Sequence, residues 1–148
     1  MTTSEPEISV FRPDRPGIRK VLGDLEAEIM ELVWSRPSGQ GVTVREIFEE
    51  LYERRRLAYT TVMSTMARLA KKRLLRAEKV DQAYVYYPTA TQEEFVSRFV
   101  GRILENLLVG FSGPTLAGLE SLSDPEAATR ARRLLEEISD RRKTEEAQ

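Results

Sequence analysis

A stretch of 26 residues near the middle of the chain is dominated by one sign of charge. Residues 54–79 carry nine basic side chains and a single acidic one, Glu78, which gives a net charge of +8. A surface of one sign is the electrostatic footprint of a site for a polyanion. The alternative is a solvated basic face that balances acidic neighbours, because the whole chain of 148 residues has a net charge of only −1.

Hydroxyl side chains precede the cations of this stretch at helical spacing. The periodicity of residues 59–72 predicts a helix with an apolar inner face and a polar outer face, on which Thr65 is also expected. Major-groove recognition needs short polar side chains near the helix start, where base edges are within reach, and longer cations beyond them for phosphates. An ordinary amphipathic helix is the alternative. We assign base reading to Thr60, Thr61 and Ser64, and phosphate contacts to Arg54, Arg55, Arg56, Arg68, Lys71, Lys72 and Lys79.

Three predicted helices and a predicted hairpin position these side chains. Capping boxes at Gly23 and Thr43 mark the first two helix starts. Asp81-Gln82 is a poor signal for a type I′ turn, so a mobile hairpin tip is expected. Helix, helix, helix and hairpin within residues 21–88 is the order of a winged helix-turn-helix, whose third helix enters the major groove. The expected helices are 23–34, 43–54 and 59–72, and the expected strands are 42–44 (very short), 76–80 and 83–88.

The amino-terminal segment is expected to lack regular structure. Residues 1–20 contain three prolines and a glycine and predict a flexible arm, whose basic side chains could reach a phosphate or a minor groove. These basic side chains are Arg12, Arg15, Arg19 and Lys20.

Residues 89–148 predict an α-helical dimerisation domain, so the fold class is mainly α with a small β-hairpin wing. A capping box at Thr91 opens a helix in which nine of the residues 92–109 are large and apolar. A short helix around Leu116, Leu119 and Leu122 and a last helix from Asp124 are too small to cover that surface. Pairing across a two-fold axis would bury it, although an internal core is the alternative. The predicted interface residues are Phe95, Phe99, Ile103, Leu107, Leu135 and Ile138.

The composition excludes several kinds of catalytic and metal chemistry. The chain has no cysteine and no histidine, which removes disulfides, thiolate or imidazole metal ligands and Ser-His-Asp catalysis. We therefore expect a protein that is not an enzyme and that has no cofactor and no metal. No apolar run reaches the roughly 18 residues of a membrane span, and no signal peptide is visible. A cytoplasmic protein without membrane contact is expected.

Four segments carry a resemblance to a known family. They are LGDLEAEIMELVW, TVREIFEEL, LAYTTVMSTMARLAKKRLL and AYVYYP, within about residues 21–90. They resemble the penicillinase and methicillin-resistance repressors (BlaI/MecI), a family that includes copper-responsive relatives of the CopY type. The resemblance implies a homodimeric winged-helix repressor that binds a double-stranded, palindromic DNA operator and dimerises through its carboxy-terminal helices. It also implies DNA contacts at Thr61, Ser64 and Arg68.

Two known release mechanisms of that family have no counterpart in this sequence. Antibiotic-responsive members are cleaved at an Asn-Phe bond, whereas the one asparagine here, Asn106, precedes Leu107. Copper-responsive members use carboxy-terminal cysteines, which this chain lacks. The sequence therefore predicts a repressor without naming its inducer. A winged helix used only for protein contacts is the rival hypothesis, and it would not need nine cations against one acid.

Overall fold

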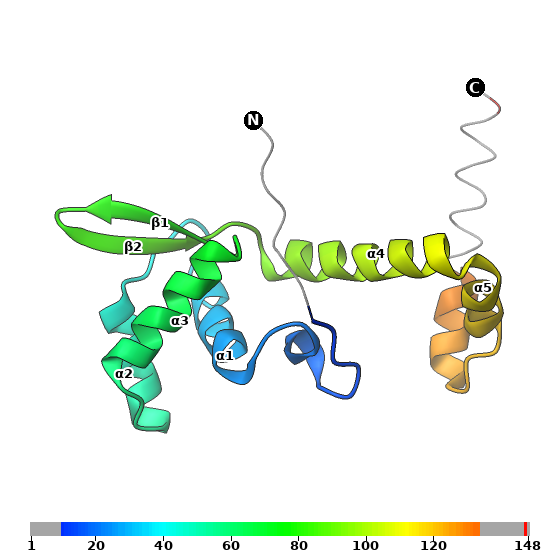
Figure 1. The fold of residues 1–148 in the computed structure, drawn as a ribbon, viewed down its shortest axis with the longest axis horizontal. Coiled ribbons are helices and arrows are strands. Elements are labelled where there is room, and N and C mark those ends of the chain that lie inside the picture. The colour runs from blue at the N-terminus through cyan, green and yellow to red at the C-terminus, as the bar shows by residue number, and fades with distance from the viewer. Residues whose placement is uncertain (1–9, 134–146, 148) are drawn as a thin grey trace. The chain divides into compact units, whose positions relative to one another are not determined.

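The computed structural model describes residues 10–133 and residue 147, and the chain divides into two compact units, Met1–Phe99 and Val100–Gln148 (Figure 1). The mainly α fold with a β-hairpin wing is confirmed. Residues 125–133 are also helical. The other elements are η1 (Gly17–Lys20), α1 (Asp24–Trp34), α2 (Val44–Arg54), α3 (Tyr59–Lys71), β1 (Leu75–Val80), β2 (Ala83–Pro88), α4 (Gln92–Gly110) and α5 (Ser112–Glu120).

Local capping interactions begin the helices of the first unit where the sequence predicts them. The Gly23 N–H donates to Glu26 Oε1 over 3.2 Å at the start of α1. Thr43 Oγ1 accepts from the Glu46 N–H over 3.2 Å at the start of α2. These hydrogen bonds provide acceptors for backbone N–H groups at the helix starts, which have no acceptor within the helix.

The apolar stripes of α1, α2 and α3 meet in one core. Burial of these side chains is the main force that holds the three helices together. The stripes fix the rotation of each helix about its axis, and this determines which side chains face outward. The fully buried members are Ile29, Met30 and Val33 of α1, Ile47 and Leu51 of α2, and Val62, Met66 and Leu69 of α3.

The wing is an antiparallel hairpin that is attached to the helices by one further bridge. Its register pairs Leu75 with Pro88 and Val80 with Ala83. Asp81 and Gln82 have φ values of 47° and 69°, so the link adopts the left-handed pair that a type I′ turn requires. The strand expected at 42–44 is a single bridge, in which Val42 and Tyr86 exchange backbone hydrogen bonds of 2.9 and 2.8 Å.

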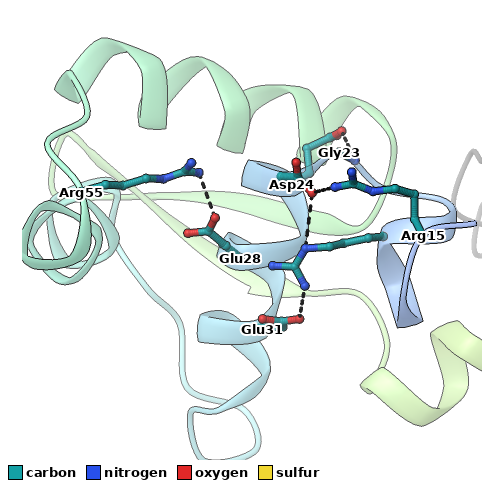
Figure 2. Close-up of polar contacts among 8 residues, drawn as sticks. Arg15, Gly23, Asp24, Glu28, Glu31 and Arg55 are labelled. Atoms are coloured by element: carbon teal, nitrogen blue, oxygen red, sulfur yellow. Dashed lines mark hydrogen bonds and ion pairs between the residues drawn. The ribbon is translucent and has the colours of Figure 1, made fainter.

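The amino-terminal segment corrects the sequence-based prediction. Residues 10–20 are not a free arm, because Ile18 is buried and two arginines of this segment pair with α1. Arg15 binds Asp24, and Arg19 lies 3.4 Å from both Asp24 and Glu31 (Figure 2). The Arg15 hydrogen bond is the main cause of the lowered pKa of the Asp24 carboxyl. Residues 1–9 of the predicted arm lie outside the described residues.

The first two turns of α4 belong to the first unit rather than to a separate carboxy-terminal domain. Phe95 packs against Trp34 at a centroid distance of 5.6 Å, and Phe99 packs against Phe95 at 5.5 Å. The division therefore falls after Phe99 and not before Thr89. In the second unit, α5 ends before Leu122, which the sequence had placed in that helix. The Glu126 N–H donates to Asp124 Oδ1 over 3.0 Å, as the predicted cap requires.

Gly41 allows the loop after α1 to approach β2. A Cβ atom at Gly41 would lie 2.8 Å from the Tyr87 ring and closer still to Val85. Gly41→Ala should therefore lower the free energy of unfolding by about 1–3 kcal/mol, the usual cost of overpacking. Urea denaturation measures this change. Gly101→Ala is the matched control, because a Cβ at this helical position meets nothing within 4 Å. An unchanged stability of Gly41→Ala would contradict the close approach.

Candidate nucleic-acid interface

The outer face of α3 presents all three side chains that the sequence assigns to base reading. Thr60, Thr61 and Ser64 are exposed on the first two turns of the helix. Ser64 Oγ donates to the Thr61 carbonyl over 3.1 Å, which orients this hydroxyl along the helix. The oxygen retains acceptor capacity for a donor from outside.

Thr65 does not belong to this face, which corrects the sequence-based prediction. Its side chain is buried, with 3% of the residue exposed, and its Oγ1 donates to the Thr61 carbonyl over 2.7 Å. At ~100° per residue, Thr65 lies nearer to the buried Leu69 than to Ser64. The hydroxyl is tolerated inside because the helix backbone accepts its hydrogen bond.

Two residues of the outer face were missed by reasoning from the sequence. Met63 is 44% exposed. Ala67 is exposed on the turn between Ser64 and Lys71. A methyl side chain projects little from the helix, so that a partner can approach the backbone at this position. The signal for both was the interruption of a polar face by small or apolar residues.

Most of the predicted phosphate contacts are exposed, and they lie on several elements. Arg55 keeps 45% of its side chain exposed while its Nη2 lies 2.9 Å from Glu28 Oε1 (Figure 2). The Arg56 guanidinium lies 5.9 Å from the centre of the Tyr52 ring. On the wing, Lys79 is paired across the hairpin with Tyr84, whose side chain is also exposed. The exposed cations of the prediction are Arg54, Arg55, Arg56, Arg68, Lys71 and Lys79.

Lys72 is the exception, and its assignment to phosphate is corrected. Its Nζ lies 2.8 Å from Glu26 Oε2, and only 9% of the Glu26 side chain is exposed. The other Glu26 oxygen accepts from the Gly23 N–H. Lys72 therefore neutralises a largely buried carboxylate and ties the end of α3 to the start of α1. Nothing in its neighbouring sequence signals this, because its partner is 46 residues away.

The described residues contain neither a metal cluster nor a helix fit to span a membrane. No group of three or more acidic side chains among them is arranged to hold a metal ion. None of the helices in residues 10–133 is both long and apolar enough to cross a bilayer.

Three helices followed by an antiparallel hairpin, with the exposed polar face on the third helix, define a winged helix-turn-helix protein. A family model described as "Penicillinase repressor" matches residues 22–141. The chain belongs to the penicillinase repressor family, so the resemblance found in the sequence is confirmed.

Individual relatives support the same assignment over part of the chain. The chain is 47% identical over 76 residues to "Transcriptional regulator BlaI" of Mycobacterium tuberculosis, covering 51% of this chain and 54% of that protein. It is 24% identical over 98 residues to "Penicillinase repressor" of Bacillus licheniformis, covering 61% of this chain and 74% of that protein. The match thus spans about half the length of the mycobacterial relative.

The neighbouring lysines at the end of α3 give a matched test of the site. Lys72→Met should lower the free energy of unfolding by about 1–2 kcal/mol, because it leaves the largely buried Glu26 carboxylate without its cation. Lys71→Met should leave stability nearly unchanged, since Lys71 is exposed. Thermal or urea unfolding measures both. Equal stability of the two variants would show that the Glu26–Lys72 pair contributes nothing.

Proposed function

We propose that this chain is a transcriptional repressor that binds double-stranded DNA as a homodimer at a palindromic operator. The observation that carries the proposal is the outer face of α3, where exposed hydroxyls near the helix start are followed by exposed cations. In a winged helix this element enters the major groove. A dimer bound at a promoter would repress transcription by occluding it.

The residues of α3 divide between reading bases and holding phosphates. Thr60, Thr61 and Ser64 lie where the helix start approaches base edges, and their hydroxyls can donate or accept. Met63 adds an exposed apolar group suited to a thymine methyl. Arg68 lies two turns further on and is long enough for a phosphate.

Cations outside the outer face of α3 extend the contact along the DNA backbone. Arg54 ends α2 and Arg56 follows it, and Lys79 lies near the tip of the wing, paired across the hairpin with Tyr84. Such contacts fix register and orientation but carry no sequence information. They also make affinity depend on salt, because each neutralised phosphate releases counterions.

The second unit supports the proposal of a homodimer. Large apolar side chains of the second unit are exposed: Leu104, Leu107 and Leu108 of α4 at 40–44%, and Phe111, the residue between α4 and α5, at 65%. A contiguous apolar surface of this kind is a typical interaction site. Of the predicted interface residues, Phe95 and Phe99 are instead core residues of the first unit. Ile103 and Leu107 remain proposed contacts, and Leu135 and Ile138 lie outside the described residues.

Three substitutions on α3 should separate base reading from phosphate contact. Thr61→Ala or Ser64→Ala should weaken operator binding by about 1 kcal/mol and leave affinity for random DNA unchanged. Arg68→Ala should weaken binding to operator and random DNA alike. Fluorescence anisotropy over a salt series, with an operator selected from genomic fragments, measures all of these. Thermal stability should hardly change, because all three side chains face outward.

The salt dependence tests the phosphate contacts directly. If each protomer neutralises about four phosphates, log affinity against log salt should have a slope near −7 for the dimer, at about −0.9 per phosphate. Arg68→Ala should flatten it by about one unit per protomer. A slope near zero would favour the protein-contact hypothesis. Loss of operator binding alone, with the slope unchanged, would mean that Arg68 reads a base.

Leu107→Asp tests the dimer, because Leu107 is 42% exposed within one chain and its loss should not unfold the protomer. Sedimentation at micromolar concentration should give twice the monomer mass of 16.9 kDa for the natural chain and the monomer mass for the variant. A carboxylate in an apolar interface is costly, which is why the pair should separate. Glu105→Ala on the same helix is the control and should remain dimeric. A natural chain that sediments as a monomer would overturn the homodimer.

A further inference from the structure

A cavity of about 480 Å³ lies in the first unit, apart from the outer face of α3. Its walls come from the end of α1 and the loop that follows it, from Arg76 of β1 and the end of β2, and from the residues that join β2 to α4 together with the start of α4. Its volume is within the range of sites for small organic ligands. The function proposed above makes no use of this cavity.

The cavity has rigid aromatic and cyclic walls. Trp34 and Tyr87 line it together with Pro37 and Pro88. Trp34 is held in place because its Nε1–H donates to the Ala90 carbonyl over 3.0 Å and its ring packs against Phe95. A flat apolar group fits such walls, because stacked or tilted ring contacts stabilise aromatic pairs beyond simple burial.

Two arginines add positive charge to these walls. Arg36 has only 18% of its side chain exposed and binds Glu50 through Nη2. The Arg76 guanidinium lies 4.7 Å from the centre of the Tyr87 ring and binds Glu78 through Nη1. Each guanidinium carries five N–H donors, so one ion pair does not exhaust its capacity. Arginine in this setting is suited to a carboxylate.

One carboxylate also lines the cavity, but it is engaged elsewhere. Glu94 Oε1 accepts from Thr91 Oγ1 over 3.2 Å, and Glu94 Oε2 lies 3.8 Å from Arg98. The Arg98 ion pair offsets part of the charge of Glu94, just as Glu50 and Glu78 offset part of the charge of Arg36 and Arg76. The lining that remains combines two cations with two aromatic rings.

The loop that closes the cavity is held by its backbone. Gly39 has a φ of 85°, a conformation that a side chain would disfavour. The close approach of Gly41 to β2 and the bridge from Val42 to Tyr86 fix the next residues of this loop. These backbone contacts hold this wall of the cavity in place, which lowers the entropic cost of binding.

We propose that this cavity binds a small aromatic carboxylate. Its ring lies between Trp34 and Tyr87, and its carboxylate is bound by Arg36 and Arg76. Residues 89–91 join the wing to α4 and also line the cavity. A ligand bound in the cavity would therefore also change the conformation of the wing. That second consequence, an altered affinity for DNA, rests on the function proposed above, whereas ligand binding does not.

Trp34 provides the test, because it is the one tryptophan of the chain and gives a single indole N–H signal. The probe is 3-phenylpropionate, added to the full-length ¹⁵N-labelled protein without DNA. The indole signal should shift in a saturable way at millimolar or lower concentration. The neutral analogue 3-phenylpropionamide should bind at least about tenfold more weakly, because it lacks the charge that pairs with arginine.

Matched arginine variants decide whether the cavity is the site. Arg76→Met and Arg36→Met should each weaken 3-phenylpropionate binding about tenfold. Arg45→Met should bind as the natural chain does, because the Arg45 side chain is 76% exposed on α2 and does not line the cavity. If Arg36→Met fails to fold, Arg76→Met and the amide comparison still give the answer. No shift with 3-phenylpropionate, or equal shifts with both probes, would overturn the proposal even if the protein binds DNA.

Discussion

Burial of the inner face of α3 is the constraint on which the rest of the first unit depends. Val62, Met66 and Leu69 have no exposed surface, and they occupy one side of the helix. All residues of a helix turn together about its axis. Burial of this side therefore determines which residues are exposed on the opposite side. The exposed hydroxyls and cations are thus a consequence of apolar packing. A substitution that rotated α3 would lose the whole face at once.

The acidic residues of α1 sort the cations of the first unit into two groups. Asp24, Glu28 and Glu31 pair with Arg15, Arg19 and Arg55, and Glu26 pairs with Lys72. The lowered pKa of Asp24 has the sign expected for a carboxylate beside arginine. Arg68 and Lys71 face outward and are not among the cations that α1 engages, whereas Arg55 is engaged by Glu28 and still has 45% of its side chain exposed. A partner that approaches this surface contacts Arg68 and Lys71 before the cations that are paired with α1.

Features set by neighbouring residues were predictable from the sequence, and features set by distant ones were not. The starts of α1, α2 and α4 follow from the capping residues Gly23, Thr43 and Thr91, because a cap acts within three residues. The hydroxyls of the outer face follow from helical spacing. The pairing of Lys72 and the docking of residues 10–20 require contacts between segments that no local pattern connects. The helical register alone places Thr65 only at the border between the two faces, and packing decides its side.

The single bridge between Val42 and Tyr86 has a consequence for how the wing opens. A hairpin of two strands is marginally stable by itself, so the wing derives its stability from the end that is attached to the helices. The Tyr86 amide donates across this bridge over 2.8 Å, and Tyr86 is one of the few buried residues of the hairpin. Opening can therefore begin at the tip, around Asp81, and proceed towards Tyr86 without disturbing the helices. Local stability therefore decreases along the hairpin from Tyr86 to the tip. Amide exchange is expected to be slow at Tyr86 and rapid around Asp81.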